Sequence, residues 1–98
     1  MGQISDKMRK TAHGFTWWCT GCEEAHPLPF EDGRWSFNGN FKAPTFTPSF
    51  KHDWGNGKCC HYIVTDGQIA YCGDCTHALA GQTIPMPDLP SHMRDNDP

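Results

Sequence analysis

The sequence has no long hydrophobic run and no excess of positive charge. No apolar stretch approaches the roughly 20 residues that a membrane-spanning helix needs, and residues 1–10 contain no apolar segment of the kind that a secretion signal carries. We therefore expect a cytoplasmic protein without a membrane partner. The formal net charge is −3 with neutral histidines. Because phosphate binding needs a basic surface, nucleic acid is not expected as a partner.

The sequence also lacks the local motifs that identify several enzyme classes. It contains no zinc-hydrolase helix motif, no glycine-rich phosphate loop and no zinc-deaminase signature. A catalytic zinc site needs an open coordination position and a general base, for which Asp74, Glu23 and Glu24 are the candidates. From these absences we expect a protein that is not an enzyme, with a small zinc hydrolase as the less favoured alternative.

The length of the chain, 98 residues with 37% hydrophobic, suits one domain with a thin core. Small domains of this kind often recruit a metal ion or a disulfide. Residues 1–13 are polar and are expected to form a flexible arm, residues 14–90 the folded domain, and residues 91–98 a disordered tail.

Alternating residues and turn signals predict a mainly β fold, a single domain of zinc-stabilised β-hairpins, with a small α+β arrangement as the alternative. Residues 15–18 are aromatic and β-branched, as is typical of strands. The clearest hairpin spans residues 61–72, where Asp66-Gly67 suits a type I′ turn and pairs Thr65 with Gln68. Period-two alternation then divides the side chains between two faces. One face carries His61, Ile63, Ala70 and Cys72, and the other carries Cys60, Tyr62, Val64, Ile69 and Tyr71.

A second hairpin is predicted at Asn38-Gly39, with Phe41 beginning the return strand. Pro44 and Pro48 bracket the next apolar segment. Because proline cannot donate to a strand ladder, this segment is predicted to lie at a sheet edge or in an extended loop.

The sharpest chemical feature is the pair Cys19-x-x-Cys22. Two thiolates at this spacing can chelate one tetrahedral ion, and zinc accepts mixed sulfur and nitrogen ligands. The redox interpretation usually needs a helix that starts at the motif, and the residues that follow do not favour one. The remaining ligands are expected between residues 59 and 77. The candidates there are Cys59, Cys60, His61, Cys72, Cys75 and His77, and a zinc-ribbon interpretation selects Cys72 and Cys75.

Several separated motifs resemble a family of small phage and prophage proteins of unknown function. These are Trp35-x-Phe37-Asn38-Gly39, Pro44-Thr45-Phe46-x-Pro48-Ser49, Cys60-His61, Asp66-Gly67-x-Ile69, and the segment from Asp74 to Thr83. Some members of that family carry the label ammonia monooxygenase, for which nothing in this sequence offers a copper or iron oxygen site. The resemblance spans roughly residues 15–89. It implies one structural zinc ion held by Cys19, Cys22, His61 and His77, with extra cysteines at 59 and 72 that keep the four-thiolate alternative open.

The resulting functional expectation is a phage-encoded zinc protein that acts as a non-catalytic protein-interaction module. A host or phage protein is the expected partner, and inhibition of a host defence protein the expected action, in the cytoplasm of the infected bacterium. Trp54, in a polar glycine-rich loop, is the best candidate for an exposed anchor. The alternative is a structural virion component, a minor capsid, neck or tail protein that assembles with copies of itself.

Overall fold

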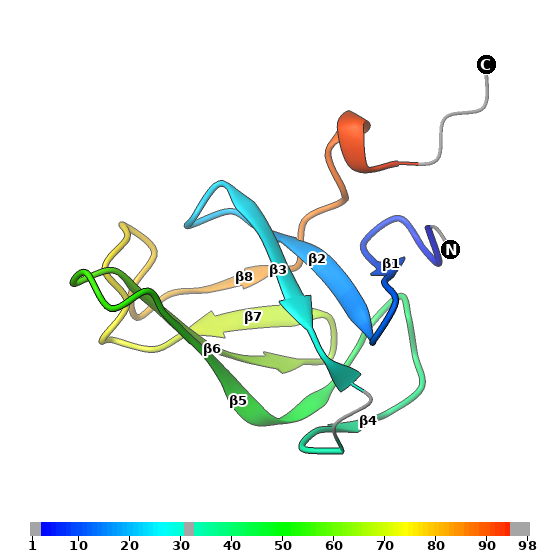
Figure 1. The fold of residues 1–98 in the computed structure, drawn as a ribbon, viewed down its shortest axis with the longest axis horizontal. Helices are drawn as coiled ribbons and strands as arrows, with labels where there is room; N and C mark the ends of the chain where they lie inside the picture. Colours follow the sequence, from blue (N-terminus) through cyan, green and yellow to red (C-terminus); the bar gives the residue numbers. More distant parts are fainter. Residues whose placement is uncertain (1–2, 31–32, 95–98) are drawn as a thin grey trace.

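The computed structural model describes residues 3–30 and 33–94, which form two antiparallel β-sheets (Figure 1). The first sheet has the strand order β1-β2-β3 and contains β1 (Arg9–Lys10), β2 (Phe15–Cys19) and β3 (Glu24–Leu28). The second sheet has the order β4-β5-β6-β7-β8 and contains β4 (Ser36–Phe37), β5 (Phe46–Asp53), β6 (Cys59–Thr65), β7 (Gln68–Tyr71) and β8 (Thr83–Pro85). A 3₁₀ turn, η2, spans Ser91–Met93. The expected mainly β, single-domain fold is confirmed.

An aromatic core fills the space between the two sheets. The Trp17 ring of β2 lies 5.3 Å from the rings of both Phe46 and Phe50 on β5, measured between centroids. Its Nε1–H donates to the hydroxyl of Tyr62 on β6 at 3.1 Å. These four side chains are at most 1% exposed. Since each buried aromatic removes roughly 150–250 Å² from water, a few large rings compensate for the small apolar fraction.

The β6–β7 hairpin has the register that the sequence predicts. Thr65 is opposite Gln68, and Tyr62 is opposite Tyr71. The turn residues Asp66 and Gly67 both have positive φ, 50° and 75°, as a type I′ turn requires. Tyr62 and Tyr71 are buried against the first sheet, whereas Ile63 is 41% exposed. The two faces of β6 therefore differ sharply, and this difference organises the site described below.

The hairpin predicted at Asn38-Gly39 is wrong in its details. Phe37 pairs with Phe46, so that residues 38–45 form a wide loop and Phe41 lies in no strand. The Asn40 side chain accepts hydrogen bonds from the backbone N–H groups of Lys42 and Ala43, at 2.9 and 3.0 Å. Side-chain bonds of this kind offer the backbone an alternative to a ladder. β4 pairs with β5 only at two residues.

Strand β5 contains an irregularity that proline permits. Phe46 pairs with Val64, and Phe50 pairs with Tyr62. The three residues 47–49 therefore face one residue, Ile63, in the partner strand. Such bulges re-aim side chains and often occur near active sites. Phe46 and Phe50 both stay in the core, while Ser49 is turned away from it and is only half-buried.

Part of the expected N-terminal arm packs on the domain. Met8 is fully buried, Arg9 and Lys10 pair with β2, and the backbone of Asp6 accepts a hydrogen bond from Leu89 N–H at 2.7 Å. Of the expected tail, residues 95–98 lie outside the described residues. Within the described residues, no helix is long and apolar enough to cross a membrane.

Candidate functional site

Four potential metal ligands from three separate segments meet between the sheets. Cys19 and Cys22 flank the turn between β2 and β3, Cys60 lies on β6, and His77 lies on the loop after β7. Their ligand atoms all lie within 4.8 Å of one another. Cys19 Sγ is 3.9 Å from Cys60 Sγ, and Cys60 Sγ is 3.4 Å from His77 Nε2. With Zn–S bonds of about 2.3 Å, a tetrahedral site has S···S edges of about 3.8 Å, which matches the observed spacing.

The turn between Cys19 and Cys22 is shaped to admit His77. Cys22 N–H donates to Cys19 Sγ at 3.3 Å, which closes the turn around the first thiol. A Cβ on Gly21 would lie 2.3 Å from the His77 ring. Glycine is therefore required here because the imidazole packs directly against the backbone.

The three thiols of this cluster differ in the direction in which their pKa values are shifted. A hydrogen bond from Cys60 lowers the pKa of Cys19, and a further one from His26 acts in the same direction. The same Cys19–Cys60 contact raises the pKa of Cys60, and burial together with the nearby Cys19 charge raises that of Cys22 to about 11. Ionising all three thiols together is therefore unfavourable without a nearby cation. A divalent metal ion supplies that charge.

The cluster differs from the expected ligand set at one position. Cys19, Cys22 and His77 are brought together as expected, but Cys60 stands where His61 was expected. The two neighbours point to opposite faces of β6, and the alternation that buries Tyr62 also turns Cys60 inward and His61 outward. Cys72 and Cys75 of the zinc-ribbon alternative also lie outside the cluster.

On the outer face of β6, His61 connects a serine with a carboxylate. Its Nε2 lies 3.2 Å from Ser49 Oγ, and its Nδ1 lies 3.1 and 3.2 Å from the two carboxylate oxygens of Asp74. If Nδ1 carries the proton and donates it to Asp74, then Nε2 is left as the acceptor for the serine hydroxyl. Side-chain exposure is 27% for His61 and 50% for Asp74. A Ser-His-Asp triad has this spatial arrangement, in which a histidine lies between a serine hydroxyl and a carboxylate.

Ser49 owes its position to the bulge in β5. A regular ladder between Phe46 and Phe50 would leave no extra residues opposite Ile63, and the bulge turns Ser49 toward the neighbouring strand. Its backbone carbonyl accepts a bond from Trp35 Nε1–H at 3.4 Å. The Trp35 ring in turn stacks on Phe50 with centroids 5.0 Å apart. The bulge is thus held from the core side.

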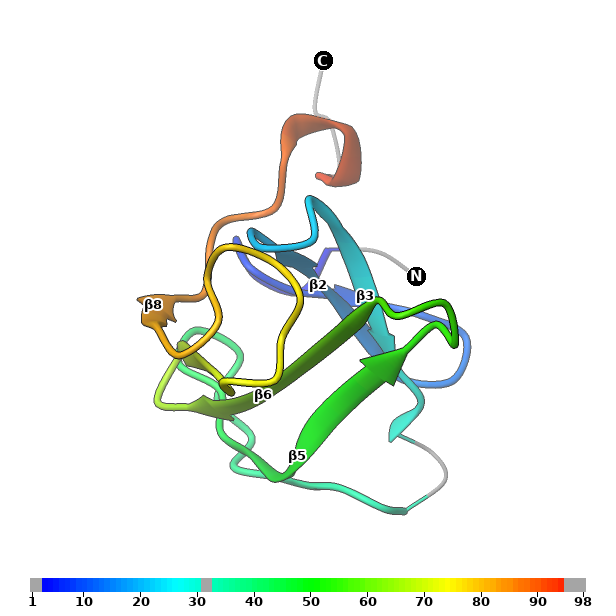
Figure 2. The same cartoon turned by 90° about the vertical axis from the view of Figure 1, so that its left-hand side faces the viewer.

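The loop from Cys72 to His77 is fixed to β6 by backbone contacts. His61 N–H donates to Cys75 Sγ at 3.2 Å, and the Cys75 thiol donates to His61 O at 3.1 Å. Thr76 exchanges bonds with Cys59, through its N–H to the carbonyl at 3.0 Å and through its Oγ1, which accepts from Cys59 N–H at 3.0 Å. The loop therefore places Asp74 on one face of β6 and His77 on the other. Figure 2 shows this loop, in yellow, folded back along β6.

A second arrangement of the same residues must be distinguished from a triad. The ligand atoms of His61, Cys72 and Asp74 also lie within 4.8 Å of one another. Three such groups could bind a metal ion, but that arrangement gives Ser49 no role, although its hydroxyl is within hydrogen-bond distance of the histidine.

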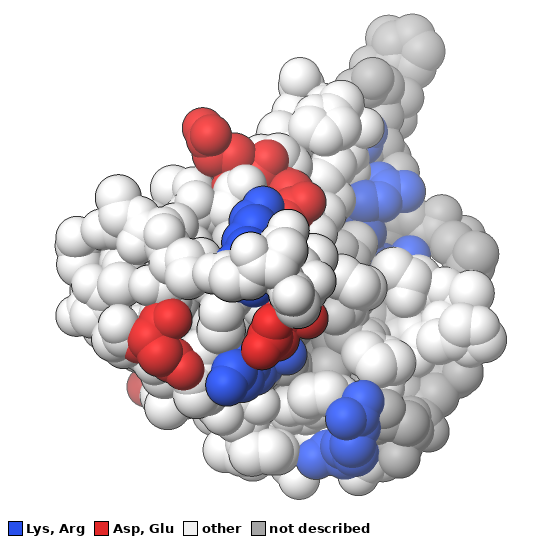
Figure 3. Space-filling view, turned by 60° about the vertical axis from the view of Figure 1, so that its left-hand side comes forward, with Lys and Arg blue, Asp and Glu red and all other residues white. Residues whose placement is uncertain are grey.

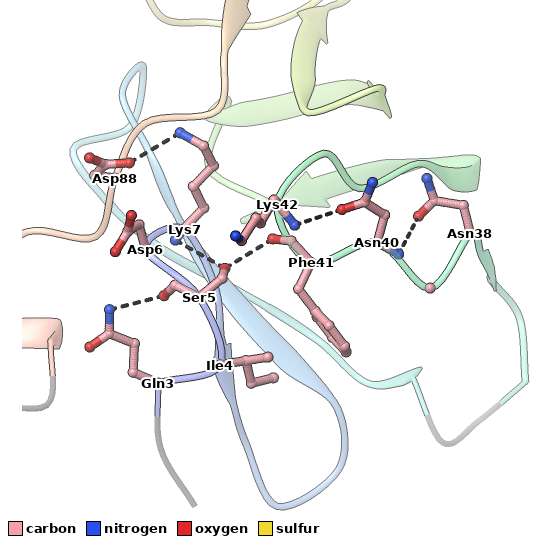
Figure 4. A pocket seen from close by; sticks show the side chains of 11 residues that line it. Gln3, Ile4, Ser5, Asp6, Lys7, Asn38, Asn40, Phe41, Lys42 and Asp88 are labelled. Carbon is pink, nitrogen blue, oxygen red and sulfur yellow. Dashed lines mark hydrogen bonds and ion pairs between the residues drawn. The ribbon is translucent and has the colours of Figure 1, made fainter.

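A large cavity, of about 1130 Å³, lies elsewhere (Figure 4). It is formed by residues 3–7, the loop 38–42 and Asp88, and contains neither the cysteine cluster nor the triad. Lys7 spans it to Asp88 at 3.1 Å, and Ser5 donates to the carbonyl of Phe41 at 2.9 Å. On the face shown in Figure 3, acidic and basic side chains are interspersed, so charge alone selects no partner there.

Sequence reasoning did not single out Ser49; it named Asp74 only as a candidate base beside a zinc ion and His61 only as a candidate zinc ligand. The signal that was available is chemical: the chain offers serine, histidine and aspartate in the motifs that carry the family resemblance. No short local motif links them, because they come from β5, β6 and the loop after β7. The register of β5 on β6, together with the hydrogen bonds between β6 and the loop after β7, brings them together.

Comparison with known proteins identifies a family of serine proteases. The family model described as "Bacterial ubiquitination-like system serine protease (BubE)" matches residues 2–72, most of the chain. The matched range includes Ser49 and His61 and ends just before Asp74. No curated protein and no solved structure matches the chain.

The family overturns the functional expectation drawn from the sequence. A non-catalytic phage module is wrong, and so is the expectation that the protein is not an enzyme, because the family is named as a serine protease. The sequence contains no local signature from which a serine protease could be predicted. The expected resemblance to a family of small phage and prophage proteins of unknown function holds only at the coarse level of a small bacterial or phage-associated family, because the family that matches is the bacterial serine protease family.

Proposed function

We propose that Ser49, His61 and Asp74 form a catalytic triad for amide-bond hydrolysis, because this chain belongs to the bacterial ubiquitination-like system serine protease (BubE) family. The single observation that carries the assignment is the continuous chain of contacts from Ser49 Oγ through both ring nitrogens of His61 to Asp74. The chain contains four serines, and Ser49 is the one that the described contacts join to a histidine and a carboxylate together.

In this proposal each residue has one role. Ser49 Oγ attacks the carbonyl carbon of the scissile bond while His61 Nε2 removes its proton. Asp74 keeps the imidazole in the required tautomer and stabilises its positive charge when it is protonated. The same proton then passes to the leaving amine. Water, activated by His61 in the second half of the reaction, releases the acyl group from Ser49.

The substrate class follows from the family name and from the openness of the site. The description places the family in a ubiquitination-like system, so the proposed substrate is an amide bond in a protein component of such a system. His61 and Asp74 are accessible at the surface, which a protein substrate can reach without entering a deep cavity. A protein partner, already expected from the sequence, would then be this substrate.

The metal centre is proposed to be a structural zinc site. Three thiolates and one imidazole, from Cys19, Cys22, Cys60 and His77, make a closed four-ligand set with no position left for substrate. Mixed sulfur and nitrogen donors favour zinc over magnesium or calcium. The ion is thus assigned to stability and not to the reaction.

The test is covalent labelling of the full-length protein with a fluorophosphonate, which reacts with activated serines. We expect one phosphonyl adduct on Ser49, located by mass spectrometry, and none in Ser49→Ala. Loss of the nucleophile should also lower kcat on the order of 10⁶-fold. Ser36→Ala, which changes an exposed serine on β4, is the matched control and should be labelled as fast as the native protein.

The metal alternative on the outer face predicts a different result. If His61, Cys72 and Asp74 bound a catalytic ion, Cys72→Ala would abolish turnover and the folded native protein would not be phosphonylated. The triad predicts that Cys72→Ala keeps both turnover and labelling. A folded protein that remains unlabelled would refute the proposed function.

A further inference from the structure

We propose that the metal centre positions the catalytic aspartate, so that the ion controls a reaction it does not touch. The inference rests on the proposed protease function. It concerns the segment from Asp74 to His77, which joins the two sites through only two intervening residues. The metal centre would act on the triad through the shape of this loop.

Contacts with β6 hold the loop at both of its ends and at two points between them. At its beginning, Asp74 meets His61 Nδ1 on the outer face. At its end, His77 meets Cys60 on the inner face, 3.4 Å from the sulfur. Between them, Cys75 exchanges two hydrogen bonds with the His61 backbone, and Thr76 exchanges bonds with Cys59. The whole loop is therefore aligned with residues 59–61 of β6, two of which, Cys60 and His61, contribute to the two sites.

Much of the loop lies outside regular structure. Asp74 and Thr76 are exposed, and His77 is only half-buried. The described segment from 72 to 82 contains no strand and no helix. Besides β6, it contacts Tyr71 of β7, through Gly81 N–H and Gln82 O and through the His77 ring, whose centroid lies 4.7 Å from that of Tyr71. Coordination of His77 would supply the strong bond that fixes one end. Without coordination, neutral hydrogen bonds and side-chain packing alone would hold the loop, which is a weaker restraint on the position of Asp74.

The consequence for catalysis is a loss of orientation. Misplacing a catalytic group by about 1 Å can cost on the order of 100-fold in rate. Binding of substrate over the outer face need not change, because Ser49 and His61 are carried by strands. The coupling therefore predicts that kcat falls while KM stays nearly constant.

The decisive variant is Thr76→Val, which removes the hydroxyl bonds to Cys59 while leaving every proposed ligand and triad residue in place. We expect full metal content, an unchanged KM and a kcat lowered on the order of 10-fold. The low-field proton resonance of an imidazole Nδ1–H bonded to a carboxylate should weaken or vanish in the NMR spectrum. Thr65→Val, on an exposed threonine at the other end of β6, is the matched control and should behave as the native protein.

Removal of the ion gives the second measurement. The protein treated with a chelator should lose both the low-field resonance and phosphonylation, and added Zn²⁺ should restore both. Should the metal-free chain unfold, Thr76→Val, which keeps the ion, tests whether the loop between the two sites sets the position of Asp74. Native kcat and resonance in Thr76→Val would overturn the coupling, as would a folded metal-free protein that keeps the resonance. Asp74→Asn calibrates the signal, since it removes the carboxylate and keeps the metal.

These outcomes separate the two proposals. If the native, metal-loaded protein is not phosphonylated on Ser49, the protease assignment fails. If it is phosphonylated but neither Thr76→Val nor metal removal alters the resonance or the rate, the protease assignment stands and only the coupling is refuted.

Discussion

The two faces of strand β6 carry two kinds of chemistry one residue apart. Cys60 points inward, is fully buried and joins two thiols and an imidazole. His61 points outward, keeps 27% of its side chain exposed and joins a hydroxyl and a carboxylate. The buried inner group suits a permanently bound structural ion, and the exposed outer group suits a substrate that binds and is released.

The difference in burial explains why Cys60 and His61 are not interchangeable as metal ligands. A buried thiol gains from a metal because ionisation without one is costly: the Cys19 contact raises the pKa of Cys60. An exposed imidazole gains little from burial and can exchange a proton with water or substrate. Pleat geometry, and not sequence distance, therefore assigns each residue to its chemistry.

The largest expected effect comes from removing a proposed metal ligand on the inner face of β6. Cys60→Ala should release the ion and unfold the domain, because structural zinc contributes roughly 10–16 kcal/mol of apparent binding energy and domains are stable by only about 5–15 kcal/mol. Metal analysis and near-UV circular dichroism of the tryptophans measure both losses. Cys59→Ser, one residue earlier on the outer face, should keep metal and spectrum. A folded, metal-loaded Cys60→Ala protein would contradict the inner assignment.

The next largest effect comes from removing the proposed catalytic base on the outer face of β6. His61→Ala should lower kcat by at least about 10⁴-fold, since both proton transfers are lost, yet retain one equivalent of metal and the native tryptophan spectrum. This reverses the expectation from sequence, in which His61 was a ligand. Steady-state kinetics and metal analysis on the same sample provide the measurement. Loss of metal in His61→Ala would restore the original ligand set.

The smallest expected effect concerns a third histidine, His52, which contacts the core. Burial, followed by the nearby charge of His26, lowers its pKa to about 4, and its Nε2 lies 3.1 Å from the Tyr62 hydroxyl. Between about pH 6.5 and 4 the unfolded chain binds a proton there that the folded chain does not, so stability falls as pH falls through this range.

His52→Gln should therefore reduce the loss of stability between pH 7 and pH 5, measured as the shift in urea midpoint. His13→Gln, at an exposed position, serves as control for the removal of a histidine. Equal shifts for His52→Gln and the native protein would show that His52 does not contribute to the acid sensitivity.

Much of the fold could be predicted because it depends on local rules. Asp66-Gly67 fixes the hairpin register, and alternation from that turn separates Cys60 from His61 correctly. The same alternation places Cys60 on the face of Tyr62, the face on which the structure brings it close to Cys19. The family resemblance favoured His61 instead, although its side chain was predicted on the opposite face.

The rest depends on features that no local rule encodes. The bulge that turns Ser49 outward is visible only as a shift in register between Phe46 and Phe50. The approach of His77 to Gly21 joins residues far apart in sequence, and it explains the glycine by a packing contact and not by a turn. Asn38-Gly39 failed as a hairpin signal because the Asn40 side chain organises a wider loop. In each case a tertiary contact decided between conformations that the sequence allows.

The order of the three proposed catalytic residues along the chain has a consequence of its own. Serine on β5 precedes histidine on β6, and aspartate follows after β7, so consecutive strands of one meander deliver them in turn. Chymotrypsin-like proteins use the order His, Asp, Ser, subtilisin-like proteins Asp, His, Ser, and α/β-hydrolases Ser, acid, His. The order of the proposed residues here matches none of these three, so the likeness to them lies in the geometry of the side chains and not in their order along the chain.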